Sequence, residues 1–108
     1  MRIATWNVNS INARLETALA VIGDLNADVV CLQELKCEDA RFPREAFEDL
    51  GFNVATHGQK TYNGVAILSK SPIEEATARL PGDPDDEQAR YLEAVIARPG
   101  GVVRVASM

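Results

Sequence analysis

The sequence lacks the features that mark membrane proteins, secreted proteins and zinc-thiolate proteins. No apolar run approaches the length of a membrane span, and the N-terminus has no apolar region followed by a small-residue cleavage site. The only two cysteines, Cys31 and Cys37, have neither a CxxC nor a zinc-ligand spacing. We therefore expect a cytoplasmic chain with reduced thiols and no contact with a membrane.

Basic residues and histidine are also scarce. The 108 residues include 11 Lys and Arg against 16 Asp and Glu, a net charge of −5, and one histidine, His57. This is not the basic excess of typical nucleic-acid-binding proteins, although it does not exclude a local basic patch, and acidic residues can serve a metal ion. A lone histidine without a neighbouring nucleophile forms no Ser-His-acid arrangement. We interpret His57 as a turn residue.

Two phosphate- and metal-binding loops are absent as well. There is no glycine-rich phosphate loop. The acidic run at residues 83–87 lacks the glycine and the distal glutamate of an EF-hand. We interpret that run as a solvated loop and not as a calcium site.

What the sequence does contain is a short apolar segment that ends in a glutamate. Residues 28–34 (DVVCLQE) read as a strand that is buried on both faces, with Glu34 at its carboxyl end. Residues 1–8 alternate in the manner of a first strand that ends near Asn7, and apolar spacings of three and four predict a helix over 12–25, capped by Ser10 or Asn12.

This strand–helix–strand order predicts a βαβ unit with parallel strands. Its geometry would bring Asn7 and Glu34 to the same edge of the sheet. A glutamate beside an amide suits a hard cation such as Mg²⁺, which often takes only one or two protein carboxylates. The alternative is that Glu34 simply turns outward to solvent, as most glutamates do.

The rest of the chain predicts one short helix and an antiparallel second half. The helix begins near Pro43, with Ala46, Phe47 and Leu50 inward and Gly51 as its C-terminal cap. The predicted strands are 52–56, 65–68, a weaker edge strand at 73–80, 91–97 and 102–106.

The loop between the strands at 52–56 and 65–68 allows two interpretations. Asn63-Gly64 favours a tight hairpin turn on structural grounds alone. The functional interpretation places Lys60 and Tyr62 at the loop tip as contacts to phosphate and sugar.

Three motifs together resemble the exonuclease III family of bacterial abasic-site endonucleases and 3′ exonucleases, within the endonuclease/exonuclease/phosphatase superfamily. They are residues 3–10 (IATWNVNS), 31–36 (CLQELK) and 58–69 (GQKTYNGVAILS). The first two are signals of the superfamily, and the third is typical of its DNA-repair branch.

The resemblance implies a four-layered α/β sandwich of two packed mixed sheets flanked by helices. It implies hydrolysis of phosphodiesters in double-stranded DNA, at abasic sites or 3′ ends, with Mg²⁺ or Mn²⁺. Glu34 would be the metal ligand and Asn7 a catalytic neighbour that positions the metal or the phosphate. The DNA contacts that the resemblance implies are Lys36, directly behind the metal site, and Lys60, Tyr62, Asn63 and Arg90.

Proteins of this family are more than twice as long, and their later catalytic motifs have no counterpart here; His57 does not match the family's catalytic histidine. Residues 1–108 therefore correspond to the N-terminal portion of one domain. We expect this portion alone to be inactive, and its exposed apolar face to pair with a C-terminal half or with a second copy. The alternatives are another phosphodiesterase of the superfamily, or a non-catalytic fragment that binds DNA or a protein partner.

Overall fold

The computed structural model describes residues 1–59, 63–78 and 91–108. Its elements in chain order are β1 (Ile3–Asn7), α1 (Leu15–Leu25), β2 (Val29–Gln33), a 3₁₀ turn (Asp39–Arg41), α2 (Arg44–Glu48), β3 (Asn53–His57), β4 (Val65–Ser69), β5 (Ile73–Ala78), β6 (Leu92–Arg98) and β7 (Gly101–Ser107).

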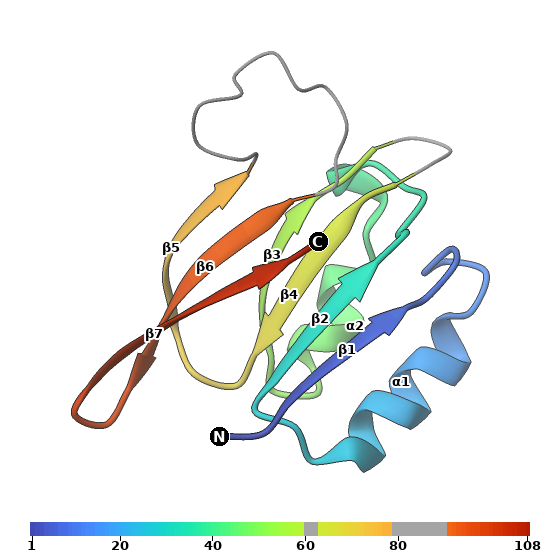
Figure 1. The fold of residues 1–108 in the computed structure, drawn as a ribbon. Coiled ribbons are helices and arrows are strands. Elements are labelled where there is room, and N and C mark those ends of the chain that lie inside the picture. The colour runs from blue at the N-terminus through green and yellow to red at the C-terminus, as the bar shows by residue number, and fades with distance from the viewer. Residues whose placement is uncertain (60–62, 79–90) are drawn as a thin grey trace.

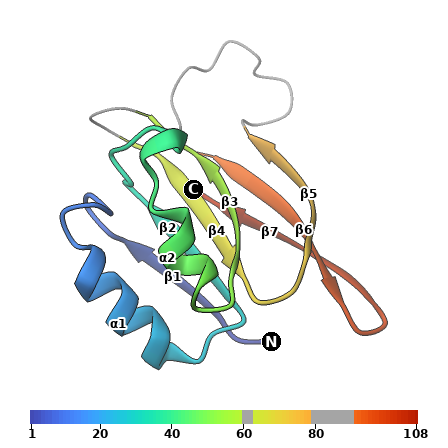
Figure 2. The same cartoon turned by 180° about the vertical axis from the view of Figure 1, so that it is seen from behind.

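These elements form three stacked layers (Figure 1). A mixed sheet of order β1-β2-β4-β3 lies in the middle, with β1 and β2 parallel and the other pairs antiparallel. An antiparallel meander β5-β6-β7 packs on one face, and α1 and α2 cover the other, as Figure 2 shows from behind. The predicted α/β architecture with two packed sheets is confirmed, as are the βαβ unit and the edge position of β5.

The position of β2 explains its sequence. Its four apolar residues point alternately to the two faces of the sheet, and all are buried. Val30 and Leu32 pack with the helices, whereas Val29 and Cys31 pack with the second sheet. A strand buried on both faces reads as a continuous apolar run because neither face meets water.

The segment before α1 differs from the prediction. The helix begins at Leu15, with Arg14 as N-cap, and neither Ser10 nor Asn12 caps it. The backbone N–H groups of Ser10 and Ile11 instead donate to the carbonyls of Glu34 and Leu35, at 2.9 and 3.1 Å. The chain therefore continues alongside the end of β2 before it can turn into a helix.

The apolar faces of both helices are narrower than predicted. In α1, Ala18 and Ile22 are buried, but Val21 and Leu25 are 39% and 38% exposed. After α2, Leu50 is 39% exposed, not inward as predicted. Phe47 is fully buried, and the predicted glycine Gly51 does follow the helix with a positive φ of 94°.

The Ser107 side chain of β7 links the second sheet to the first through hydrogen bonds. The buried Ser107 hydroxyl donates to the carbonyl of Leu32 at 3.1 Å and accepts from the Gln33 amide at 3.1 Å. Gln33 also donates to the Thr5 hydroxyl at 2.9 Å. These hydrogen bonds join β1, β2 and β7 near the carboxyl ends of the two parallel strands.

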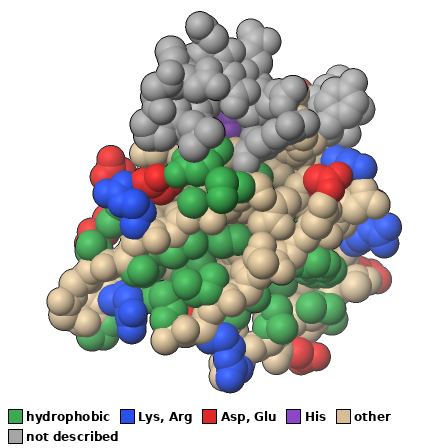
Figure 3. Space-filling view, viewed as in Figure 1, with side chains coloured by type: hydrophobic (Ala, Val, Ile, Leu, Met, Phe, Trp, Pro, Cys, Tyr) green, Lys and Arg blue, Asp and Glu red, His purple; other side chains and the backbone are tan. Residues whose placement is uncertain are grey.

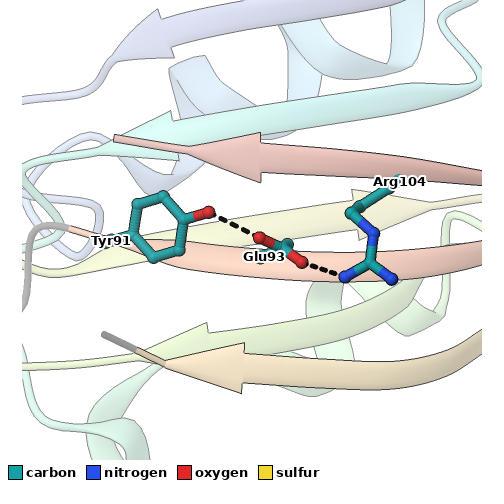
Figure 4. Close-up of polar contacts among 3 residues, drawn as sticks. All are labelled: Tyr91, Glu93 and Arg104. Carbon is teal, nitrogen blue, oxygen red and sulfur yellow. Dashed lines mark hydrogen bonds and ion pairs between the residues drawn. The ribbon is translucent and has the colours of Figure 1, made fainter. Parts of the chain in front are cut away.

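The outer face of the meander combines apolar and charged side chains. Figure 3 shows hydrophobic side chains across the middle of this face and charged ones mostly toward its rim. Val102 is 58% exposed. Between the strands, Glu93 pairs with Arg104 and accepts a 2.6 Å hydrogen bond from the Tyr91 hydroxyl (Figure 4), and these two contacts lower the pKa of Glu93.

Candidate active site

The parallel pairing of β1 and β2 brings Asn7 and Glu34 together, as predicted. Asn7 lies opposite Gln33 in the register, so Glu34 follows directly beside it. The Asn7 side-chain amide donates a hydrogen bond to Glu34 Oε2. The structure describes no hydrogen bond to Oε1, the other carboxylate oxygen, from the residues it covers.

Backbone strain is concentrated at this edge of the sheet. Among the described residues, six non-glycine residues have positive φ, and all but Asn26 lie here. The five at this edge are Asn9 (47°), Ser10 (83°), Glu34 (53°), Lys36 (55°) and Asn63 (55°). Such residues cluster at functional sites, where the surrounding structure holds the strained conformation. The left-handed turn at Glu34 takes its side chain out of the alternation of β2.

Asn9 connects Lys36 to Glu34 and was not identified from the sequence. The Lys36 ammonium donates to Asn9 Oδ1 at 2.6 Å, and the Asn9 backbone N–H donates to Asn7 Oδ1 at 3.1 Å. With the bond from Asn7 to Glu34, one continuous chain of hydrogen bonds orients the carboxylate. The available signal was the residue type, since asparagine tolerates the left-handed conformation better than most residues.

Two open hollows of about 380 Å³ each flank this chain of hydrogen bonds. The first, the Glu34 pocket, is lined by Asn7, Gln33, Glu34, Asn63, Gly64, Val65 and Met108. The second, the Lys36 pocket, is lined by Asn12, Lys36, Cys37, Glu38 and Arg41. The sheet edge therefore offers a hollow with one carboxylate, Glu34, beside one that carries two cationic side chains and the carboxylate of Glu38.

The two thiols are free and buried. Cys37 was expected in a polar loop, yet its side chain packs into the helix-side core. Burial raises the pKa of Cys31, and burial together with the Asp39 carboxylate raises the pKa of Cys37. Neither thiol is therefore an activated nucleophile.

The loop that follows β3 reaches the same edge. The backbone N–H groups of Leu35 and Lys36 donate to the carbonyls of Gly64 and Asn63, at 3.1 and 2.8 Å. Asn63 thus lies near Glu34, and its role as a DNA contact stays a prediction. Lys60, Tyr62 and Arg90 lie outside the described residues, as does the acidic run at 83–87.

His57 is not the turn residue that we expected. It is the last residue of β3 and is partly buried, and its Nε2 atom has no hydrogen-bond partner among the residues that the structure describes. It takes no part in the hydrogen bonds that join Lys36, Asn9, Asn7 and Glu34.

The donor set at the Glu34 pocket fits a magnesium-type cation. Residues 1–59, 63–78 and 91–108 contain no group of three His, Cys, Asp or Glu side chains that could hold a metal. A single carboxylate in an open hollow still suits Mg²⁺, because this cation keeps several waters and commonly takes only one or two protein carboxylates with substrate phosphate. It does not suit Zn²⁺, which prefers thiolate and imidazole ligands.

Comparison with known proteins places the chain in a family. Residues 4–106 match the model of the Endonuclease/Exonuclease/phosphatase family. The chain belongs to this family.

Its relatives in the endonuclease/exonuclease/phosphatase family include DNA-repair nucleases. Exodeoxyribonuclease III of Haemophilus influenzae is 36% identical over 105 residues, which cover 97% of this chain and 39% of that protein. The 3′-5′ exonuclease NExo of Neisseria meningitidis superposes with a TM-score of 0.89 at 42% identity, over 98% of this chain and 40% of NExo. An AP endonuclease from Archaeoglobus fulgidus gives a TM-score of 0.83 at 39% identity, over 90% of this chain and 37% of that one.

This member therefore spans about two fifths of the length of the relatives it matches. Within that span it carries the Glu34 pocket and the segments around it. The described part of the chain has no helix long and apolar enough to cross a membrane.

Proposed function

We propose that the chain forms the metal- and phosphate-binding corner of a DNA-repair nuclease that hydrolyses phosphodiesters in double-stranded DNA. The activities are those of a 3′-5′ exonuclease and an abasic-site endonuclease, with Mg²⁺ or Mn²⁺ as cofactor. The observation that carries the proposal is the carboxylate of Glu34, which Asn7 orients over an open pocket.

Each residue of this corner has a role that its contacts support. Glu34 holds the cation, and Asn7 fixes the carboxylate through its amide while Asn9 fixes Asn7. Bound there, the cation would stabilise charge on the phosphate oxygens and lower the pKa of a water molecule. Lys36, which lines the Lys36 pocket and is held by Asn9, adds positive charge two residues after Glu34.

The DNA contacts in this proposal are Lys36, Lys60, Tyr62, Asn63 and Arg90. Basic and amide side chains position a nucleic-acid backbone without reading its sequence. A local cluster of this kind serves an acidic protein because screening limits charge interactions to about 10 Å. The net charge of −5 therefore does not oppose backbone contacts at this one edge.

The second part of the proposal concerns apolar side chains that are exposed on the outer face of the meander and on the edge strand β1. Ile3 on the edge strand is 50% exposed, Val102 is 58% exposed and Met108 is 74% exposed. We propose that a polypeptide equivalent to the rest of the relatives' domain, or failing that a second copy of this chain, covers these residues. Sedimentation of the 108-residue chain tests this, since a monodisperse monomer that binds no hydrophobic dye would contradict it.

The reaction proposed here belongs in the cytoplasm. Both cysteines are free and lie in the interior, and reduced thiols are the rule in that compartment. Expression of the chain under reducing and oxidising conditions, followed by thiol counting, checks the expectation that neither thiol becomes disulfide-bonded.

Manganese provides the sharpest test of the cation site. Titration of the isotope-labelled chain with Mn²⁺ should broaden the amide signals of Asn7, Glu34 and Leu35 first. Glu34→Gln removes the charge and should abolish this selective broadening. Glu38→Gln, which removes an exposed carboxylate from the neighbouring pocket, should leave it intact. Equal broadening in all three proteins would exclude Glu34 as the ligand.

Nicking of a duplex with one abasic site tests the reaction itself. We expect no nicking by the 108 residues alone, because most of the transition-state stabilisation comes from groups outside this part of the family's domain. Nicking that depends on Mg²⁺ and is lost in Glu34→Gln would show that these residues suffice. Salt-dependent duplex binding that chelation does not change would favour a non-catalytic DNA-binding role.

A further inference from the structure

Gly58, at the start of the loop between β3 and β4 (residues 58–64), packs closely against the backbone of residues 37–39, just after Glu34. An ideal Cβ atom at Gly58 would lie 2.5 Å from the carbonyl oxygen of Cys37, 2.7 Å from the nitrogen of Asp39 and 2.8 Å from the carbonyl carbon of Glu38. All three neighbours are main-chain atoms, so no side chain can swing aside to make room. Gly58 is therefore required here for its size, and its φ is not in the positive region that favours glycine.

A side chain closes the same contact from the other side. The Gly58 backbone N–H donates to Asp39 Oδ1 at 2.7 Å. Asp39 begins the 3₁₀ turn Asp39–Arg41, whose last residue lines the Lys36 pocket. The contact thus joins the loop to the segment that forms this pocket.

The far end of the loop is anchored to the same segment. Leu35 and Lys36 bind the carbonyls of Gly64 and Asn63 through their backbone N–H groups. A Cβ atom at Gly64 would lie 3.0 Å from Cβ of Leu35, so these residues are also in close contact. Both ends of the loop are consequently fixed to residues 35–39, within five residues of Glu34.

We propose that Gly58 and Asp39 are positioning residues that hold the described residues of the β3–β4 loop, Asn63 above all, beside the Glu34 carboxylate. Neither residue contacts the substrate in this proposal. They act through Asn63, whose place beside the Glu34 pocket depends on the loop being held at both ends. The inference rests on the proposed function, because it assigns to this loop a share of the DNA contact.

The charge of Asp39 distinguishes a positioning role from a direct electrostatic effect on DNA binding. Asp39 is an exposed carboxylate, so its removal would by itself favour binding of a polyanion. If Asp39 instead fixes the loop, Asp39→Ala weakens duplex binding although it removes a negative charge. Asp39→Asn keeps an oxygen acceptor for the Gly58 N–H and removes the same charge, so it should bind DNA at least as tightly as the natural chain.

The experiment measures two quantities on the 108-residue chain and its variants. Amide hydrogen exchange of Lys36 reports whether the far anchor is still closed, with the Val8 amide, bonded to the Gln33 carbonyl at 3.0 Å, as internal reference. Fluorescence anisotropy of a labelled abasic duplex reports binding, at a protein concentration and temperature where each variant is folded by circular dichroism.

We expect Gly58→Ala and Asp39→Ala to speed exchange at Lys36 by about tenfold or more without changing Val8. Both should weaken duplex binding by about fivefold to tenfold, the loss that one or two hydrogen-bonded contacts produce. Gly101→Ala is the matched control, because a Cβ atom there meets nothing within 4 Å. If Gly58→Ala does not fold, Asp39→Ala against Asp39→Asn decides the question.

The outcomes distinguish this inference from the proposed function. Unchanged exchange at Lys36 in both alanine variants would overturn the positioning role, whatever happens to DNA binding. Faster exchange with undiminished duplex binding would overturn it too, because the loop would then carry no DNA contact. A further outcome is that the natural chain binds no duplex while the Lys36 amide exchanges faster in the two alanine variants. That result would contradict the proposed function but would still show that Gly58 and Asp39 anchor the loop.

Discussion

The carboxyl edge and the opposite edge of the four-stranded sheet are built differently. At the carboxyl edge the chain turns through five non-glycine residues with positive φ, whereas at the other edge the described residues include one, Asn26, which ends α1 in the left-handed conformation. Asparagine after a helix is an ordinary cap. A glutamate and a lysine in this conformation are not ordinary, and they are the residues that line the two pockets.

The side-chain hydrogen bonds also differ between the two edges. At the opposite edge Asp28 accepts from the Arg2 N–H at 2.7 Å, and Asn53 donates to the carbonyls of Ser69 and Ser71 at 3.2 and 3.1 Å. These side chains satisfy the hydrogen-bonding capacity of backbone N–H and C=O groups at strand ends. At the carboxyl edge Asn7, Asn9 and Lys36 bind one another's side chains and Glu34. Side chains at the opposite edge therefore bind strand backbone, whereas those at the carboxyl edge hold one another in a polar cluster.

The largest expected effect separates the two asparagines. Asn7→Ala should weaken Mn²⁺ binding by about 10- to 100-fold, the usual cost of losing a residue that orients a metal ligand. Asn53→Ala should leave Mn²⁺ binding unchanged and lower the free energy of unfolding by about 1–2 kcal/mol, because two backbone carbonyls lose a partner. Metal titration and urea unfolding of both variants measure this. Equal effects of the two variants on metal binding would remove the distinction between the edges.

The sequence supported the parallel pairing of Asn7 and Glu34 because strand periodicity and topology are enough to place strand ends together. It did not reveal Asn9, Asp39 or Gly58, whose roles depend on which loops meet in space. Ser10 and Asn12 looked like helix caps because local preference favours them there. The structure uses the backbone of residues 10 and 11 to extend the contact with β2, which no local pattern encodes.

A smaller effect, on stability alone, is expected at Asp28. The hydrogen bond from the Arg2 N–H, with the nearby N-terminus, Lys70 and Arg98, lowers the pKa of Asp28 below its usual value of about 3.9. A lowered folded-state pKa gives stability that is present above the unfolded value and lost as the pH falls through the folded one. The melting temperature of the natural chain should therefore fall more than that of Asp28→Asn as the pH is lowered below about 3.9, the usual pKa of an aspartate. Identical pH profiles would show that Asp28 has no such role.

The smallest effect concerns the strain itself. Ser10→Gly should raise the free energy of unfolding by up to about 1 kcal/mol, because a φ of 83° is costly for serine and not for glycine. Asn26→Gly should gain only a few tenths of a kcal/mol, since asparagine already tolerates its φ of 51°. Chemical denaturation measures both. A greater gain at Asn26 than at Ser10 would mean that strain is not concentrated where the pockets lie.

The hydrogen bonds of Ser107 have a consequence for the order in which the protein assembles. They link β7 to Leu32 and Gln33 across 75 and 74 positions in the chain. Contacts of such separation form late, because the entropy of closing a long loop is lost before the contact is gained. During synthesis the helices and β1–β4 can pack early, but the edge with Glu34 is completed only after residue 107 has left the ribosome. A nascent chain can therefore form the core between the four-stranded sheet and the helices before the end of β2 next to Glu34 gains its contacts with β7.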